Sequence, residues 1–276
     1  MKTDLHIHSN WSDGSLGIPH LVRLAKTLGI DVISITDHDT VSGQEQTLEE
    51  GKRQGVRIIP GIEISAFNPG TGRKTHILGY NVKDTNTLER TCRPFLRLRH
   101  EKNLEALHLV ETAGYPITAE AVKSYAALDG TVYRQHIMHA LIDRGFELSI
   151  YGPLYKKLFG NGGLAVVKTS YMSAEEAVKL ICNCGGVAVL AHPFMYDSMD
   201  FIPQLAQWGL SGLEYQHHTQ TQERQEAVIN AAGKYNLFLT GGSDFHGFYS
   251  EKALPPGSTG TELPPEHPLI KPKPAV

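Results

Sequence analysis

The sequence predicts an α/β protein in which a parallel sheet, open or closed into a barrel, is interrupted by a small helical insertion domain. Short apolar, β-branched runs alternate with segments of helical period over residues 1–94 and again over 171–253, as in parallel sheets. Residues 95–170 show helical periods and no clear strand, so we expect them to leave the sheet and return. The 276 residues suffice for one large barrel, although two small domains remain possible.

Apolar periodicity defines the elements of the first half. Residues 2–7 are predicted as a strand. Residues 18–28 are predicted as a helix, because their apolar side chains recur on one helical face. Pro19 suits the first turn of this helix, and Gly29 suits its end. Strands at 31–36, 56–65 and 76–82 and a helix at 44–54 follow. Pro60 interrupts the strand at 56–65.

The second half begins with the insertion, where we expect helices at 95–113, 119–125, 134–145 and 151–160. A helix at 174–184 marks the return to the sheet, because Ser173 and Glu176 have the spacing of a capping box. Strands at 186–191, 212–215 and 237–240 follow. The proline-rich tail, 254–276, is expected to be extended and poorly ordered.

Composition excludes several classes of partner. The formal net charge of −3 provides no global attraction to duplex nucleic acid or to anionic membranes. The N-terminal MKTDLHIHS lacks the apolar run of an export signal, and the most apolar stretch, 186–191, is too short to span a membrane. We therefore expect a cytoplasmic protein that does not associate with membranes and that binds any anionic substrate through local charges.

Three cysteines, Cys92, Cys182 and Cys184, cannot all form disulfides with one another. Cys182 and Cys184 have the spacing of half a metal site, but no second cysteine pair lies nearby. The preferred interpretation is that all three are thiols packed against helices.

Histidines and carboxylates gather where the predicted strands end. The carboxyl ends of parallel barrel strands share one rim, so residues far apart in the sequence meet there. His6 and His8 are two residues apart on an extended chain and can bind one cation together. Buried imidazoles and carboxylates without a metal ion or charged partner would each cost several kcal/mol. The sequence therefore predicts a metal cluster, for which the strand-end residues are His6, His8, Asp37, His38, Asp39, Glu63, His192, Asp244 and His246.

Six ordered motifs, DLHIHSNWSDG, ITDHDTVSG, GIEIS, HILGY, AHP and GSDFHG, resemble those of the PHP family, named from polymerase and histidinol phosphatase. The resemblance extends from the start of the chain to about Gly247. It implies a distorted (β/α)7 barrel with two or three divalent metal ions, Mn, Zn or Fe, at its rim. It also implies three sets of ligands: His6, His8, Glu63 and Asp244 for one ion; Glu63, His76 and His192 for a second; Asp13, His38 and His246 for a third. Asp13 stands where some relatives have histidine.

Within this family the chain is most similar to the nucleoside 3',5'-bisphosphate phosphatases and the 5'-to-3' oligoribonucleases. In these proteins an RPHIA segment of the insertion provides an arginine and a histidine to the substrate phosphate. The matching segment here begins Arg134-Gln135-His136, with glutamine in place of proline. The resemblance thus implies that Arg134 and His136 bind substrate and take part in catalysis. A guanidinium group suits this role because it binds two phosphate oxygens at once, although pairing of Arg134 with Asp143 or solvent remains open.

Further candidates follow from position alone. His217 and His218 come after the predicted strand 212–215, so one of them is expected to contact substrate or to donate a proton to the leaving oxygen. Glu214 is expected to support a ligand rather than to bind a metal ion. A basic edge of Arg93, Arg97, Arg99 and Lys102 fits either further phosphates or a solvated helix face.

The expected function is that of a metal-dependent phosphohydrolase. A metal-activated hydroxide, held between two ions on either side of Glu63, would cleave a phosphomonoester or phosphodiester of a nucleotide. A nucleoside 3',5'-bisphosphate, AMP and a short oligoribonucleotide are the expected substrates.

Three alternatives remain open. The first is a histidinol phosphatase. The second is a module that binds metal or nucleotide without turnover, although the full set of ligands argues against it. The third is an amidohydrolase, a class that usually carries a bridging lysine, and no lysine ends a predicted strand.

Overall fold

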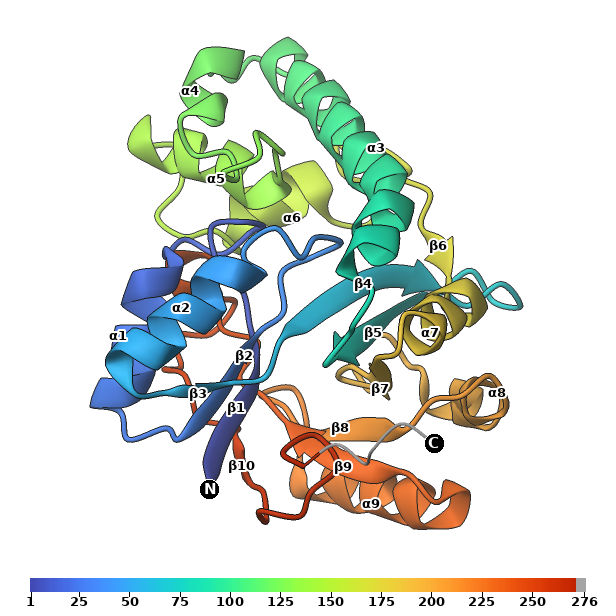
Figure 1. The fold of residues 1–276 in the computed structure, drawn as a ribbon. Helices are drawn as coiled ribbons and strands as arrows, with labels where there is room; N and C mark the ends of the chain where they lie inside the picture. The colour runs from blue at the N-terminus through green and yellow to red at the C-terminus, as the bar shows by residue number, and fades with distance from the viewer. Residues whose placement is uncertain (272–276) are drawn as a thin grey trace.

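The computed structural model describes residues 1–271, whose strands form two sheets (Figure 1). One sheet has four strands in the order β10-β1-β2-β3, and the other has six in the order β6-β4-β5-β7-β8-β9. The bounds are β1 (Lys2–Ile7), β2 (Val32–Ile35), β3 (Arg57–Ile58), β4 (Gly61–Phe67), β5 (Lys74–Tyr80), β6 (Met172–Ser173), β7 (Val187–Leu190), β8 (Gly212–Gln216), β9 (Phe238–Gly241) and β10 (Thr261–Glu262).

Isolated pairs of residues join the two sheets at two places. Ile7, at the end of β1, pairs in parallel with Phe245, which follows β9. His38, beyond the end of β2, pairs in parallel with Glu63 in β4. These two seams make the sheets into one distorted barrel, and the predicted fold class is confirmed.

Strand β5 departs from the parallel pattern, because it runs antiparallel to both β4 and β7. Its first residues therefore lie at the rim where the parallel strands end. The strand begins at Lys74, two residues before the predicted start at His76. The earlier start of β5 places the charged side chain of Lys74 at the rim.

Helices cover the outer faces of both sheets (Figure 1). The four-stranded sheet has α1 (Ile18–Thr27) and α2 (Gln44–Gln54), and the six-stranded sheet has α7 (Ala174–Asn183), α8 (Ile202–Gln207) and α9 (Gln222–Tyr235). The predicted capping box is present at the start of α7. The Ser173 hydroxyl accepts a hydrogen bond from the Glu176 amide at 3.2 Å, and the Glu176 carboxylate accepts one from the Ser173 amide at 3.0 Å.

The predicted helical insertion contains α3 (Thr85–Thr112), α4 (Ala119–Lys123), α5 (Arg134–Asp143) and α6 (Pro153–Phe159). It has a core separate from that of the barrel, including Leu107, Val110, Ile137 and Leu158. The predicted start of its first helix, at 95, is wrong. Asp84 caps α3 eleven residues earlier by accepting a hydrogen bond from the Thr87 amide at 3.0 Å. Pro94 removes one hydrogen bond inside this long helix without ending it.

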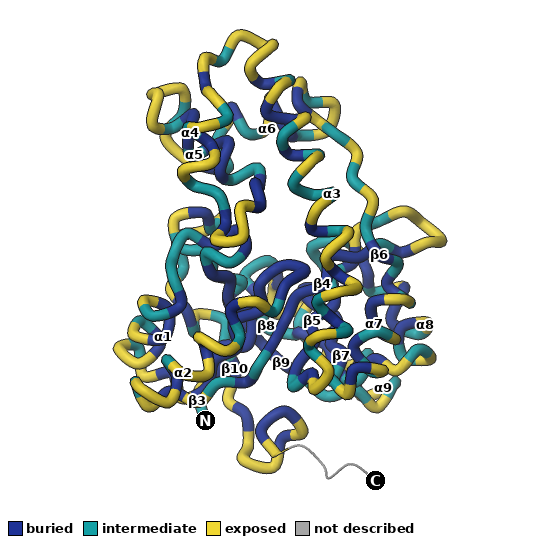
Figure 2. The backbone as a smooth tube through the Cα atoms, turned by 45° about the horizontal axis from the view of Figure 1, so that its top comes forward, coloured by how far each residue is buried: buried dark blue, intermediate teal, exposed yellow. Residues whose placement is uncertain are grey.

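The expectation of a poorly ordered tail is wrong for residues 254–271. β10 pairs antiparallel with β1 through Thr3 and Thr261. Leu263, Leu269 and Ile270 are buried and belong to the same apolar cluster as Leu5 and Tyr80. Figure 2 shows this segment at the end of the barrel opposite the insertion. Apolar residues between the prolines thus anchor the segment, and the rest of the predicted tail, 272–276, lies outside the described residues.

The buried cysteines confirm the packing interpretation. Cys92 and Cys184 lie in the largest apolar cluster, Cys182 packs against it, and all three are free thiols. Within residues 1–271, no helix is long and apolar enough to cross a membrane.

Replacing Leu269 by alanine should lower the free energy of unfolding by about 2–4 kcal/mol, because it removes a buried side chain under the first strand. Thermal and urea unfolding would measure the change. The matched variant Leu148→Ala removes a side chain that is 91% exposed, so its effect should stay within about 0.5 kcal/mol. Equal stability of the two variants would show that the segment does not anchor the barrel.

Candidate metal centre and substrate cavity

The seams of the barrel also position the candidate metal ligands. The Asp244 amide donates to the His6 carbonyl at 2.9 Å, and the His8 amide donates to the Phe245 carbonyl at 2.9 Å. At the second seam, the Glu63 amide donates to the Asp37 carbonyl at 3.2 Å. The imidazoles of β1 and the carboxylates of β4 and of the segment after β9 therefore face one another across the rim.

The first group consists of His6, His8, Glu63 and Asp244, whose ligand atoms lie within 4.8 Å of one another. The Nε2 atoms of His6 and His8 lie 3.3 and 3.2 Å from Glu63 Oε2. The same nitrogens lie 3.4 and 3.2 Å from Asp244 Oδ1. Both histidines are completely buried.

Glu63 faces a second group with its other oxygen. His76 Nδ1 and His192 Nε2 lie 2.8 and 3.0 Å from Glu63 Oε1. His38 Nδ1 approaches Oε2 at 3.1 Å. Although burial favours protonation of Glu63, the surrounding imidazoles hold the pKa of this carboxyl well below its usual range. Glu63 thus presents a carboxylate with one oxygen toward each group.

The third group consists of His8, Asp13, His38 and His246. Asp13 Oδ1 lies 3.4 Å from His246 Nε2 and 3.8 Å from His8 Nδ1, and Asp13 Oδ2 lies 3.9 Å from His38 Nε2. The structure thus brings together all nine residues that the family resemblance implies as metal ligands. Asp37 and Asp39, which were also predicted at the rim, instead contact the hydroxyls of Ser9 and Ser12 and the guanidinium group of Arg99.

The donor set fits divalent metal ions. Several buried ligand atoms have no hydrogen-bond partner, namely His6 Nε2, His8 Nδ1 and Nε2, Asp13 Oδ1 and His192 Nδ1. Unpaired buried polar atoms are costly, and a cation among them would satisfy those that face a group. Imidazole and carboxylate ligands without thiolates suit Zn, Mn and Fe.

A second layer of carboxylates orients these side chains. Glu214 lies 3.0 Å from His6 Nδ1 and accepts a hydrogen bond from the His192 amide at 2.8 Å. Asp37 accepts hydrogen bonds from the hydroxyls of Ser9 and Ser12 at 2.7 and 2.6 Å, which fixes the loop that leads to Asp13. Such contacts set the ring orientation of metal-binding histidines.

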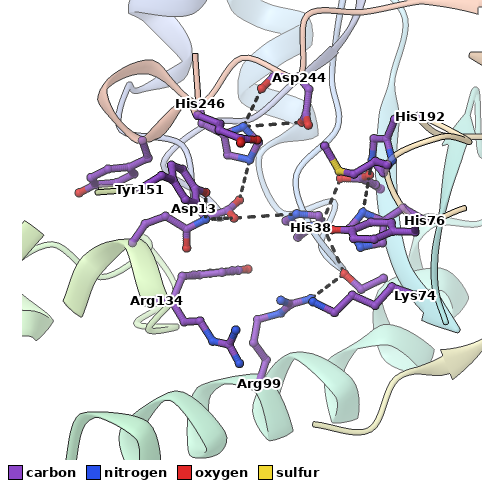
Figure 3. Close-up of a pocket in the computed structure, with 18 of the residues that line it drawn as sticks. Asp13, His38, Lys74, His76, Arg99, Arg134, Tyr151, His192, Asp244 and His246 are labelled. Atoms are coloured by element: carbon purple, nitrogen blue, oxygen red, sulfur yellow. Dashed lines mark hydrogen bonds and ion pairs between the residues drawn. The ribbon is translucent and has the colours of Figure 1, made fainter. Parts of the chain in front are cut away.

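A cavity of about 380 Å³ lies between this cluster and the insertion. Figure 3 shows Arg99 and Arg134 across from Asp244 and His246, and Lys74 beside His76. Tyrosines complete the lining, namely Tyr133, Tyr151, Tyr155, Tyr171, Tyr196 and Tyr249. A small anionic ligand would lie between positive side chains and the metal cluster.

Of the predicted basic edge, Arg99 lines the cavity and Arg93, Arg97 and Lys102 do not. Arg99 donates to Asp39 at 2.7 Å and to the Ser65 hydroxyl at 2.6 Å. Because Asp39 follows β2 and Arg99 belongs to α3, this pair attaches the insertion to the barrel.

Arg134 and His136 lie in the first turn of α5 and differ in their surroundings. Arg134 lines the cavity and stacks over Phe159 at 5.5 Å. Asp143 is contacted by Tyr125 and His139 instead. His136 is 1% exposed and does not line the cavity, so its predicted role with substrate stays a prediction. Its Nδ1 accepts a hydrogen bond from the Tyr133 amide at 3.1 Å and closes the start of the helix. Burial lowers the pKa of His136 to about 4.

The two histidines after β8 are also separated. His217 is buried behind the cluster, with Nε2 3.3 Å from Asp244 Oδ2 and Nδ1 2.8 Å from the Thr219 hydroxyl. It does not line the cavity, so the structure does not support substrate binding by His217. His218 does line the cavity, and its Nε2 has no hydrogen-bond partner.

Two residues at the cavity, Gln135 and Lys74, were not predicted. Gln135 donates to Asp13 Oδ2 at 3.0 Å and to the Tyr151 hydroxyl at 3.2 Å, which connects the insertion with the third group. Lys74 reaches the cavity from the start of β5. The sequence signal that could have identified Lys74 is its position two residues before His76, because side chains two residues apart share a face of a strand.

Comparisons with known proteins agree with this site. The PHP domain model matches residues 4–186. The phosphoribosyl 1,2-cyclic phosphate 1,2-diphosphodiesterase of Eggerthella lenta is 38% identical over 248 residues, 90% of this chain and 95% of that protein. A 5'-3' exoribonuclease of Haemophilus influenzae is 32% identical over 251 residues, 89% of this chain and 90% of that protein.

A solved structure from Bifidobacterium adolescentis, assigned as a metal-dependent phosphoesterase, has a TM-score of 0.86 and 26% identity, and the match covers 94% of this chain and 92% of that one. The family model, the relatives and the shared fold agree on the family and on the class of reaction. The chain belongs to the PHP family and is a metal-dependent phosphoesterase.

Proposed function

We propose that this enzyme hydrolyses a phosphomonoester or phosphodiester of a nucleotide or a related ribose phosphate. The supporting observation is that Lys74, Arg99 and Arg134 line the same cavity as the cluster of imidazoles and carboxylates. A nucleoside 3',5'-bisphosphate, AMP, a ribose cyclic phosphate and a short oligoribonucleotide fit this description. The relatives named as a cyclic phosphate diphosphodiesterase and as an exoribonuclease act within the same range of substrates.

The three groups around Glu63 would hold two or three divalent ions, with Mn, Zn and Fe as candidates. When bound, these ions would supply positive charge to the reacting phosphate and a water of lowered pKa. Glu63 would hold two ions side by side, because its two oxygens face different groups.

Arg134 would bind the oxygens of the reacting phosphate. Among residues 1–271, no carboxylate lies within 4.0 Å of its guanidinium group, so its charge is available to a ligand. A planar guanidinium group binds two phosphate oxygens together and can follow the charge that develops in the transition state. His218, whose Nε2 is unpaired in the cavity wall, would donate a hydrogen bond to the leaving oxygen.

The cavity favours small anions over the alternatives. A duplex is too wide for a cavity of about 380 Å³ between barrel and insertion. Histidinol phosphate has a cationic amino group, which the unpaired positive charges of Lys74 and Arg134 in the cavity lining would repel. The cavity thus favours nucleotides and ribose phosphates over histidinol phosphate.

The proposal is tested with Mn²⁺ by measuring inorganic phosphate released from mononucleotides, adenosine 3',5'-bisphosphate and histidinol phosphate, and nucleotides released from short RNA. Turnover should be highest with a nucleotide or RNA substrate. Preference for histidinol phosphate, or no turnover by the metal-loaded protein, would overturn it.

Glu63→Gln should abolish turnover and remove at least one metal ion per chain, because a neutral amide bridges two cations poorly. Elemental analysis after metal-supplemented expression would count the ions, and circular dichroism would confirm the fold. Glu49→Gln, at an exposed position, is the matched control and should keep its metal. Unchanged metal content in Glu63→Gln would refute the bridging role.

Arg134→Ala should lower kcat/KM by about 30- to 1,000-fold, which corresponds to about 2–4 kcal/mol of transition-state binding. Metal content should stay constant, because the guanidinium group contacts no candidate ligand. A monophosphate and an oligonucleotide should be affected equally. Arg144→Ala, at the exposed end of α5, should behave like the unmodified protein. A loss confined to oligonucleotides would instead place Arg134 on a track for longer substrates.

Gln135→Leu should weaken binding of the least tightly held ion by about 10- to 100-fold, because Asp13 loses the donor that orients it. Calorimetric titration of metal-depleted protein with Mn²⁺ would measure the affinity. Gln222→Leu, on the exposed side of α9, should leave it unchanged. Equal affinities of the two variants would show that Asp13 is held without Gln135.

A further inference from the structure

Lys74 is the cationic residue of the cavity that the proposed reaction does not yet use. It begins β5 and lines the cavity, where its side chain is accessible to solvent. Among residues 1–271, no carboxylate lies within 4.0 Å of its ammonium group. Arg99 differs, because Asp39 neutralises it at 2.7 Å. The charge of Lys74 therefore has no acidic partner in the protein.

The neighbours of Lys74 add positive charge and aromatic surface. Its Nζ lies 5.8 Å from the ring centres of both Tyr171 and Tyr196, and Arg99 and Arg134 line the same wall. The aromatic faces stabilise an ammonium group weakly, and the two guanidinium groups repel it. An anion beside Lys74 would relieve this repulsion.

The strand fixes how far this anion lies from the metal cluster. Lys74 pairs with Phe67, and His76 pairs with Ser65, so β5 is regular between the two residues. Side chains two residues apart on a strand share a face and are about 6.7 Å apart. Lys74 is thus one step farther from the cluster than His76, a distance comparable with the span of one ribose and its ester linkages.

We propose that Lys74 binds a second phosphate group of the substrate, about one ribose unit from the phosphate that is cleaved. This inference rests on the proposed function and narrows its substrate class to a ribose that has two phosphate groups. The relatives' names are compatible with it. Phosphoribosyl 1,2-cyclic phosphate has a cyclic phosphate and a second phosphate on one ribose, and RNA has a phosphate on either side of each internal ribose.

The test compares Lys74→Met, which keeps the length of the side chain and removes its charge, with the unmodified metal-loaded enzyme. The substrates are adenosine 3',5'-bisphosphate and the adenosine monophosphate that keeps only the cleaved phosphate. For the bisphosphate, KM should rise about 10- to 100-fold, as expected for loss of one hydrogen bond between charged groups. For the monophosphate, the rise in KM should be at least about fivefold smaller, because this substrate has no second phosphate for Lys74 to bind. Lys74→Arg should restore most of the preference for the bisphosphate.

Lys179→Met is the matched control, because Lys179 is exposed on α7 and pairs with Glu175 away from the cavity; both substrates should be unaffected. Equal losses for the two substrates in Lys74→Met, or no loss for either, would overturn the inference while the proposed function stands. If the unmodified enzyme released no phosphate, the proposed function would fail. Calorimetric titration with adenosine 3',5'-bisphosphate would then test whether Lys74 binds the second phosphate. An affinity at least tenfold weaker in Lys74→Met would support the inference, and equal affinity would overturn it.

Discussion

Two short sets of backbone hydrogen bonds close the barrel, and the rest of the site depends on them. One set connects the end of β1 with the segment after β9, and the other connects the segment after β2 with β4. His6, His8, Glu63 and Asp244 are themselves part of these seams. The geometry of the candidate metal centre is therefore a direct result of barrel closure, because a shift at either seam would move candidate ligands on both sides of it. Rigid closure is how a scaffold holds together side chains that belong to distant parts of the chain.

Glu63 belongs to two of the three groups, and His38 connects it with the third. Its backbone belongs to one seam, and its two carboxylate oxygens face different imidazoles. The insertion contributes Arg99 and Arg134 to the cavity beside this carboxylate, and the barrel contributes Lys74. Negative and positive groups thus line one cavity. A phosphate placed between them would meet metal charge on one side and side-chain cations on the other, which is the arrangement that phosphoryl chemistry requires.

Much of the fold could be predicted, because strand and helix periods are local properties. The strand-end rule also predicted that residues such as His6, His38 and Asp244 would meet. Side-chain direction could not be predicted in the same way. His136 turns back to the Tyr133 amide and His217 turns to Asp244, and neither choice is encoded in spacing. Lys74 was missed because its strand runs against its neighbours, and that direction depends on pairing with β4 and β7. The order of the segment after Leu254 depends on contacts with β1, more than 250 residues away in sequence.

The anchoring of this C-terminal segment has a consequence for synthesis of the protein. β1 emerges from the ribosome first, but its neighbours include Phe245 and β10. Asp4, two residues before the first histidine, accepts hydrogen bonds from the Ser243 amide at 2.9 Å and the Gly257 amide at 2.6 Å. A nascent chain therefore has HxH exposed long before the partners that complete its coordination exist. Domains fold as units once their last segments are available, so the HxH pair alone offers only part of the candidate metal site until the segment after β9 has joined the barrel.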